Sequence, residues 1–182
     1  MKLRADCVLF IAGLAATGTA AWDLTRYSVF QHDTNSARVA RIPVVRWLVD
    51  ERAVETLGRL RSRKCGLNVT VVEGDDEASL SIAAGHVPGT ASLGAPGNSV
   101  VAGHRDTAFR CLSKIRIGDK IEVGGQRSYT YRVTSITIVN PDDVSVMAPG
   151  PGTTLTLITC YPFRHIGPAP KRFVVTGELL KS

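Results

Sequence analysis

The chain has 182 residues, and a composition of 44% hydrophobic and 21% charged side chains excludes a disordered protein. Its net charge of +6 lies mostly before residue 65, and the rest of the sequence is close to neutral. A nearly neutral C-terminal part lacks the basic face of a nucleic-acid-binding domain, so we expect no nucleic acid among the partners.

An apolar run at residues 7–22 follows the basic residues Lys2 and Arg4. The run is short for a membrane span but sufficient in a thinned bilayer, and the positive-inside rule places its basic end in the cytoplasm. We therefore predict that residues 1–22 form a cytoplasmic tip and a single-pass membrane anchor. A cleaved signal peptide is the alternative, because residues 17–21 are rich in small side chains.

Residues 23–57 are polar and basic, with scattered Ala, Val and Trp. This pattern predicts a stalk with partial helix, which holds the following part away from the membrane. From Gly58 the sequence changes to short β-rich runs separated by turns that contain Gly and Pro. We predict one folded domain over residues 58–182.

The β-rich runs predict an all-β fold with short helices, a small closed barrel or a sandwich of seven or eight strands. The runs are Leu67–Glu73, 98–104, 120–123, Tyr129–Val139, 153–160 and Lys171–Leu179. Short helices are expected over residues 78–83, with Asp75 or Asp76 as the N-cap, and over residues 106–114. Residues 85–97 are expected to form a loop.

The run at residues 153–160 ends on Cys160, beside a loop that contains several prolines. Side chains alternate along a strand, so the thiol points away from the face of Leu155 and Leu157. If the leucines face the core, Cys160 faces a surface, where it is a candidate nucleophile. A small buried hydrophobic residue is the alternative.

Cysteine chemistry also needs a proton donor for the leaving group and hydrogen-bond donors for the oxyanion. His104 ends a predicted strand and is the candidate acid/base, and Arg172 opens the last strand and faces away from the core. A hydrogen-bonded loop histidine and a solvated basic residue are the ordinary alternatives. His86 and His165 are rival bases, and Asp106 either orients an imidazole or caps the following helix.

The other cysteines are Cys7, Cys65 and Cys111, and none has the CxxC spacing of zinc-ribbon or thioredoxin-type sites. Cys65 and Cys111 could form a disulfide in an exported protein, whereas Cys7 lies in the apolar run. The acidic run at residues 73–77 is expected to be a solvated turn and helix start. We therefore expect no metal site and no cofactor.

Residues 156–160, TLITC, match the TLxTC signature of sortases, the cysteine transpeptidases of bacterial cell surfaces. Residues 97–121 (GNSVVAGHRDTAFRCLSKIRIGDKI) resemble the segment around the sortase histidine, most of all that of class D sortases. Residues 139–147 and 160–175 are also similar to that class. These segments occur in the right order, and the resemblance covers about residues 58–180.

The resemblance implies an eight-stranded closed sortase β-barrel in which Cys160 is the nucleophile, His104 the general acid/base and Arg172 the stabiliser of oxyanion or substrate. It implies a membrane-anchored cysteine transpeptidase, or peptidase, without cofactor or metal. Such an enzyme cleaves a C-terminal LPxTG-like sorting signal of exported proteins through a thioacyl intermediate. It then transfers them to an amine acceptor, a cell-wall peptide or a pilin lysine, on the extracytoplasmic side of the cell membrane.

The chain departs from the family pattern at residues 61–65, where a usually apolar strand is basic and carries Cys65. Two further functions remain open: a pilin-polymerising sortase, and a non-enzymatic membrane-anchored β-barrel binding module in which Cys160 is unreactive. A transpeptidase of the L,D-type is not favoured. Its cysteine follows Gly and its histidine follows Ser, and neither context occurs here.

Overall fold

The computed structural model describes residues 27–28, 31, 55–125, 127–165 and 167–180. The chain divides into two compact units, Met1–Arg52 and Ala53–Ser182, and all the strands found among the described residues belong to the second. The predicted anchor, residues 1–22, and most of the predicted stalk, residues 23–57, lie outside the described residues. Within the part of the chain that is described, no helix is both long and apolar enough to cross a membrane.

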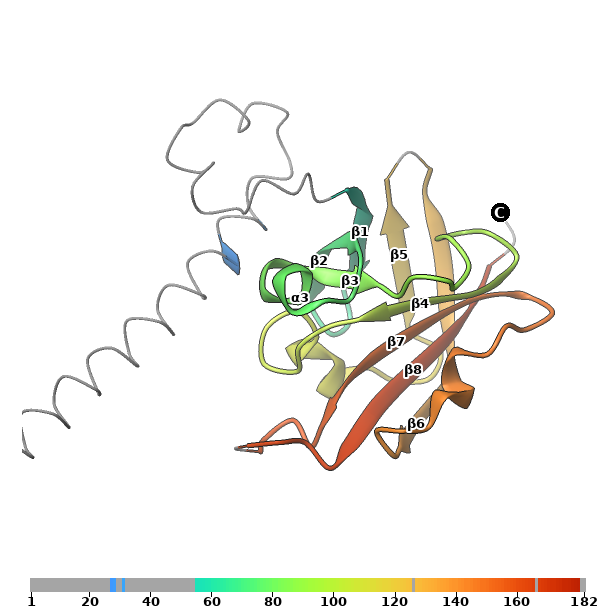
Figure 1. Cartoon of the computed structure of the whole chain (residues 1–182). Coiled ribbons are helices and arrows are strands. Elements are labelled where there is room, and N and C mark those ends of the chain that lie inside the picture. Colours follow the sequence, from blue (N-terminus) through green and yellow to red (C-terminus); the bar gives the residue numbers. More distant parts are fainter. Residues whose placement is uncertain (1–26, 29–30, 32–54, 126, 166, 181–182) are drawn as a thin grey trace, which may run out of the picture. The chain divides into compact units, whose positions relative to one another are not determined.

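Eight strands close into a barrel in the order β1-β2-β3-β4-β7-β8-β6-β5 (Figure 1). Their bounds are β1 Thr56–Ser62, β2 Leu67–Glu73, β3 Ala84–His86, β4 Gly97–Ala102, β5 Lys120–Gly124, β6 Tyr129–Val139, β7 Thr153–Tyr161 and β8 Lys171–Leu179. β2 pairs with β3, and β4 with β7, in parallel, and the other neighbours are antiparallel. The predicted eight-stranded closed β-barrel is confirmed.

The interior of the barrel is filled by alternate residues of the strands. β-Branched residues dominate β7 and β8 and favour an extended backbone. The core residues that are at most 1% exposed include Leu60, Val69, Val71, Val101, Ile121, Tyr131, Val133, Leu155, Leu157 and Val175. Because Leu155 and Leu157 belong to this core, alternation along β7 places Cys160 on the outer face, in agreement with the sequence-based expectation.

Three short helices connect the strands: α3 (Glu77–Ile82), η2 (Arg110–Lys114) and η3 (Val144–Met147), of which the last two are 3-10 helices. Asp76 is the N-cap of α3. Its Oδ1 accepts hydrogen bonds from the backbone N–H groups of Ala78 (3.0 Å) and Ser79 (3.2 Å). The predicted helix start is therefore confirmed, because the cap satisfies N–H groups that have no partner within the helix.

The structure corrects the expected strand limits around the site. Ala84–His86 forms β3, whereas the sequence predicts a loop over residues 85–97. Three residues are too few to show an alternating pattern. β4 ends at Ala102, so His104 lies beyond the strand and not at its end.

The segment after β4 also differs from expectation. The sequence predicts a helix over residues 106–114, but only Arg110–Lys114 is helical. Phe109 is the N-cap and no side chain caps the helix, so the expected capping role of Asp106 is wrong. Phe109 and Leu112 are fully buried, and this burial holds the segment against the barrel in place of a cap.

Asn98 fixes the connection between β6 and β7 against the outer face of β4. Its side chain is 8% exposed, and its Nδ2 donates to the carbonyl oxygens of Val146 (3.1 Å) and Ala148 (3.2 Å). Its Oδ1 accepts from the hydroxyls of Thr154 (3.2 Å) and Thr156 (2.7 Å) on β7. The amide thus uses its full hydrogen-bonding capacity to tie η3 to β4 and β7.

We predict that Asn98→Ala lowers the free energy of unfolding by about 2 kcal/mol, because it leaves buried hydroxyl and carbonyl groups without their partner. Urea unfolding followed by circular dichroism measures the change. Asn68→Ala is the matched control, since Asn68 is exposed and accepts one hydrogen bond from Arg59 Nε at 2.7 Å. Equal losses in the two variants would contradict the tethering role of Asn98.

Candidate active site

Cys160 and Arg172 lie directly opposite each other on the antiparallel strands β7 and β8. Residues paired in this way point to the same face of the sheet, with Cα atoms about 5 Å apart. The nearby pair Leu157 and Val175 faces the core, and both side chains are fully buried. Alternation therefore puts Cys160 and Arg172 together on the outer face, where both are half-buried.

His104 reaches the same level from β4, which pairs in parallel with β7 as far as Ile158. Beyond this last pair, the N–H of Gly103 donates to the carbonyl of Ile158 (3.1 Å), and the hydroxyl of Thr159 donates to the carbonyl of Gly103 (2.7 Å). The chain thus stays beside β7 for a further residue, which brings His104 level with Cys160. Cys160 and Arg172 thus lie on the neighbouring strands β7 and β8, and His104 lies just beyond the end of β4, the other neighbour of β7.

The imidazole of His104 is open to solvent on this side of the barrel, with 37% of the side chain exposed. Its acidic neighbour is Glu77, whose Oε1 lies 3.9 Å from Nε2 on a side chain that is 88% exposed. An ion pair at this distance and exposure holds the ring only weakly. The imidazole is therefore free to turn toward a bound molecule.

The guanidinium of Arg172 is held by backbone carbonyls at the base of the β7–β8 loop. Its Nη1 donates to the carbonyl oxygens of Lys171 (3.1 Å) and Ala169 (3.3 Å). Among the described residues, no carboxylate forms an ion pair with Arg172. Its charge is therefore not neutralised within this part of the chain, and a planar guanidinium carries several N–H donors.

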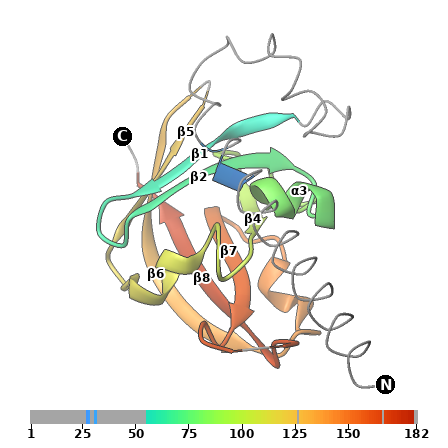
Figure 2. The same ribbon diagram turned by 90° about the vertical axis from the view of Figure 1, so that its left-hand side faces the viewer.

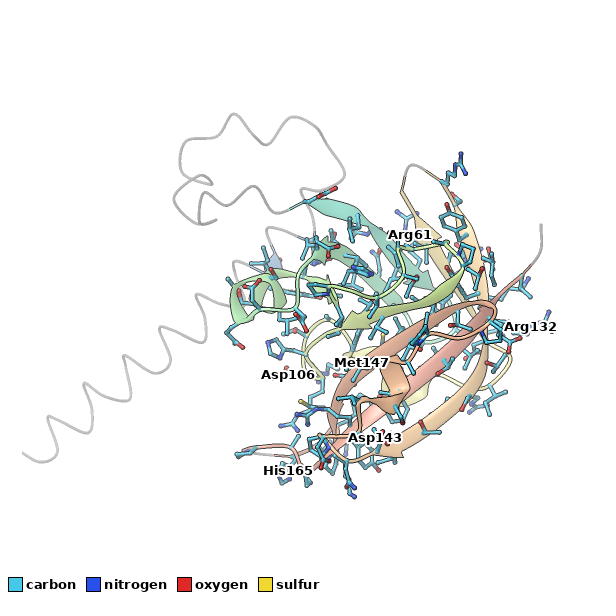
Figure 3. The ribbon with its side chains drawn as sticks, turned by 45° about the vertical axis from the view of Figure 1, so that its right-hand side comes forward. Arg61, Asp106, Arg132, Asp143, Met147 and His165 are labelled. Carbon is cyan, nitrogen blue, oxygen red and sulfur yellow. The ribbon has the colours of Figure 1, made fainter. Side chains whose placement is uncertain are left out.

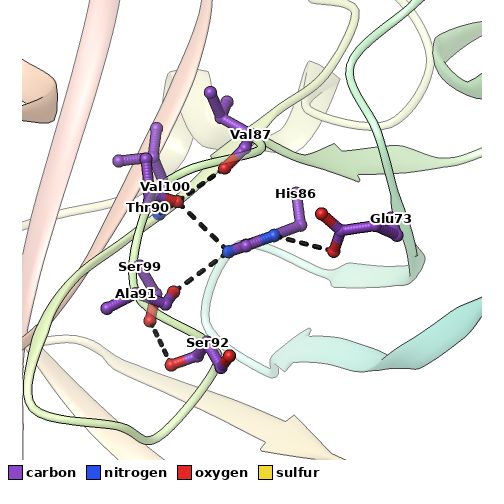
Figure 4. Close-up of polar contacts among 8 residues, drawn as sticks. All are labelled: Glu73, His86, Val87, Thr90, Ala91, Ser92, Ser99 and Val100. Atoms are coloured by element: carbon purple, nitrogen blue, oxygen red, sulfur yellow. Dashed lines mark hydrogen bonds and ion pairs between the residues drawn. The ribbon is translucent and has the colours of Figure 1, made fainter.

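His86 has a structural place in the barrel and is excluded as the acid/base by its surroundings. It is 5% exposed, and its Nδ1 lies 2.9 Å from Oε2 of Glu73 on β2 (Figure 4). Its Nε2 lies 3.0 Å from the carbonyl of Ala91 and 3.1 Å from the hydroxyl of Thr90. Both ring nitrogens are thus engaged, and the ring joins β2 and β3 to the loop before β4.

His165, the other rival, is an exposed residue of the β7–β8 loop (Figure 3). Its Nε2 lies 3.1 Å from the carbonyl of Pro168, within the same loop. No strand register fixes it beside Cys160. The structure therefore favours His104 over both of its rivals, since His104 alone follows a strand that pairs with β7.

Arg105 is a site-positioning residue that the sequence analysis did not single out. Its Nη2 donates to the carbonyl oxygens of His165 (2.8 Å) and Gly167 (3.2 Å). These bonds join the residue after His104 to the loop that follows Cys160. The only sequence signal was its place in the GHRDT segment, because hydrogen bonds to distant carbonyls leave no pattern in the sequence.

Three aromatic rings hold the base of the same loop. Tyr161 and Phe173 stack with ring centroids 6.1 Å apart, and Phe163 meets both edge-on at 6.1 and 5.1 Å. Contacts of this kind stabilise beyond the area they bury. The loop between the strands of Cys160 and Arg172 is therefore fixed at its base by packing and farther along by Arg105.

The acidic run at residues 73–77 is engaged in contacts within the protein. Glu73 pairs with His86, and Asp76 caps α3. Throughout the described residues, no three His, Cys, Asp or Glu side chains are grouped in a way that could hold a metal ion.

Comparison with known proteins gives matches over nearly all of the barrel. Residues 60–180 match the model of the sortase domain. The chain is 33% identical over 123 residues to Sortase D of Bacillus subtilis (strain 168), a match that covers 66% of this chain and 62% of that relative. The match thus spans less than two thirds of the length of this curated relative.

Solved structures show the same fold. Sortase E from Streptomyces avermitilis superposes with a TM-score of 0.61 and 32% identity, covering 70% of this chain and 89% of that one. A sortase D5 transpeptidase from Clostridium perfringens covers 88% and 99% with a TM-score of 0.65, and at 21% identity this likeness concerns the fold alone. Since the sortase domain model accounts for nearly all of the barrel, the chain belongs to the sortase family.

Proposed function

We propose that this chain is a membrane-anchored cysteine transpeptidase of the sortase type, which acts on exported proteins at the extracytoplasmic side of the cell membrane. One observation carries the proposal. β4, β7 and β8 are neighbours in the barrel, Cys160 is paired with Arg172 on β7 and β8, and His104 follows β4 two residues beyond its last pair with β7, so that the register sets the three residues in one row. A nucleophile, an acid/base and a cation are the groups that acyl transfer through cysteine requires.

In the first half of the reaction, the thiolate of Cys160 attacks the threonine carbonyl of an LPxTG-like sorting signal. The carbonyl oxygen becomes an oxyanion, and Arg172 donates hydrogen bonds to it. When the intermediate collapses, the peptide bond breaks and His104 gives its proton to the departing amine. The threonine remains joined to Cys160 as a thioester.

In the second half, an amine acceptor attacks the thioester carbon. The acceptor loses a proton to His104, and Cys160 leaves as the thiolate. The exported protein is then joined to the acceptor through a new amide bond, and both groups have returned to their starting protonation states. Water in place of the amine gives hydrolysis, so the same residues also make a thiol peptidase.

The sorting signal is proposed to bind on the outer face of β4 and β7, next to η3. Two tethers described above support this assignment. Asn98 fixes the β6–β7 connection to these strands, and Arg105 fixes the β7–β8 loop. A peptide on this face thus meets segments that are held in place before it binds, which lowers the entropic cost of binding.

The finer assignments belong to the same proposal. The 33% identity to Sortase D supports assignment of the chain to class D. The basic residues followed by an apolar run support a membrane anchor at residues 1–22. The acceptor is proposed to be a cell-wall amine. A pilin-polymerising enzyme would instead use a lysine of its own substrate, and incubation of the thioacyl enzyme with each type of amine separates the two.

A binding module without activity is the alternative from another class. Iodoacetamide labelling of the native full chain in detergent distinguishes it, because a nucleophilic thiol on an open face reacts and is lost to catalysis. Unreactive Cys160 together with an absence of peptide cleavage would favour the module, whereas stoichiometric labelling of Cys160 without loss of peptide cleavage would show that Cys160 is not the nucleophile.

We predict that Cys160→Ala abolishes turnover of LPxTx-type peptides and the thioacyl adduct, because no other residue of the row can form a thioester. Intact-mass spectrometry of the full chain with a peptide library detects the adduct and identifies the accepted signal. Cys111→Ala is the control that also removes a thiol, and it keeps the adduct. Peptide cleavage by the purified Cys160→Ala variant would contradict the assignment of Cys160 as the nucleophile.

Substitution of His104 and substitution of His86 should have different effects. His104→Ala is expected to lower kcat by about 10²- to 10⁴-fold with the melting temperature unchanged, because the ring is exposed and weakly held. His86→Ala is expected to lower the free energy of unfolding by about 1–3 kcal/mol, since it leaves buried partners unsatisfied. Peptide turnover below the melting temperature of each variant measures kcat, and the reverse pattern would show that the roles are exchanged.

Arg172→Ala is expected to lower kcat by about 10²- to 10³-fold with a smaller change in KM, because an oxyanion donor acts mainly in the transition state. Arg172→Lys should recover only part of this loss, since a single ammonium lacks the planar set of donors. Lys171→Ala, at the exposed neighbouring position, is the control for charge alone. An equal effect of Lys171→Ala would point to general electrostatics on this face.

A further inference from the structure

Cys65 and Cys111 meet on the barrel although they are far apart in the sequence. Cys65 lies in the turn between β1 and β2 and is 8% exposed, and Cys111 lies in η2 and is half-buried. In both ribbon views the β1–β2 turn runs beside the yellow η2 segment (Figures 1 and 2). Each thiol has the largest effect on the pKa of the other, as expected of neighbouring sulfur atoms.

Both cysteines are held by ordered backbone on each side of the contact. The turn of Cys65 is closed by the N–H of Gly66, which donates to the carbonyl of Ser62 (2.9 Å). The segment of Cys111 is anchored by its neighbour Leu112, which is fully buried. Both cysteines are therefore carried by segments that are packed in place, and a disulfide requires two such neighbouring positions.

The two thiols also differ in their readiness to lose a proton. The hydrogen bond from Cys111 holds the pKa of Cys65 well below its usual range, and the same bond, followed by burial, raises the pKa of Cys111. The pair thus releases a first proton easily and retains the second. One thiolate beside one thiol is the state from which thiol–disulfide exchange begins.

We propose that Cys65 and Cys111 form a disulfide that ties η2 to the β1–β2 hairpin, with a small disulfide or a disulfide-exchange protein as the oxidant. Such oxidants act outside the cytoplasm, so the cellular setting rests on the proposed function, whereas the bond itself does not. η2 closely follows His104 in the chain, and the crosslink fixes this segment to the β1–β2 hairpin. Cys160, on β7, takes no part.

The step balances as a two-electron exchange. The thiolate of Cys65, whose pKa is lowered, attacks one sulfur of the oxidant, and the S–S bond of the oxidant breaks to release one thiolate. Cys111 then attacks the sulfur of Cys65 in the mixed disulfide. The second half of the oxidant leaves and takes up the proton of Cys111, so two cysteines are oxidised and one disulfide is reduced to two thiols.

The test uses the full chain in detergent, equilibrated in a glutathione redox buffer, denatured and alkylated with iodoacetamide. The chain has four cysteines, so we expect only Cys7 and Cys160 to be alkylated after oxidation and all four after reduction with dithiothreitol. Trypsin should release one reducible species that joins residues 65–105 to residues 111–114. Oxidation should also raise the melting temperature by about 5–15 °C, because the crosslink closes a long loop.

Three variants identify which cysteines form the crosslink. Cys65→Ser and Cys111→Ser should each abolish the crosslinked species and the dithiothreitol-dependent shift in melting temperature. Cys160→Ala should form the crosslink as the native chain does, so a failure of the proposed catalytic role leaves this test intact. Four alkylated cysteines under oxidising glutathione, or a crosslink that includes Cys7 or Cys160, would overturn the proposal without any need for the variants to fold.

Discussion

The parallel pairing of β4 with β7 is the constraint on which the candidate site depends. It runs over six residue pairs, and the hydrogen bonds of Gly103 to Ile158 and Thr159 extend it beyond the end of β4. This extension places His104 beside Cys160. The antiparallel pairing of β7 with β8 then adds Arg172 on the other side. Backbone register, more than contacts among the three side chains, therefore brings the groups of the site together.

Alternating β-branched residues made much of the barrel predictable. β2, β6 and β8 have the bounds expected from the sequence, because each is long enough to show its pattern. β3 was missed because it is short and stands in a segment rich in Gly and Pro. The expected cap at Asp106 was wrong since burial of Phe109 and Leu112 replaces a cap there. Tertiary contacts prevailed wherever the local pattern was brief or weak.

The candidate site was likewise predictable only in part. Cys160, His104 and Arg172 could be named from the sequence because they stand near the expected strand ends and in segments that resemble sortases. Rejecting His86 required its burial and its contacts with Glu73, and these depend on which strands are neighbours. The tether made by Arg105 could not be foreseen for a related reason. Its partners are backbone carbonyls of a distant loop, and every residue type carries a carbonyl.

The long crossover between β4 and β7 has a consequence for when the site comes into being. η2, β5, β6 and η3 all lie between His104 and Cys160 in the chain. Contacts between residues so far apart form late in folding, because closing a long loop costs entropy before any contact repays it. Until the barrel closes, Cys160 is a solitary thiol without its proposed proton donor or cation. Under the proposed function, completion of the fold is thus itself the activating event, and a chain still unfolded after its synthesis carries no assembled site with which to cut nearby peptides.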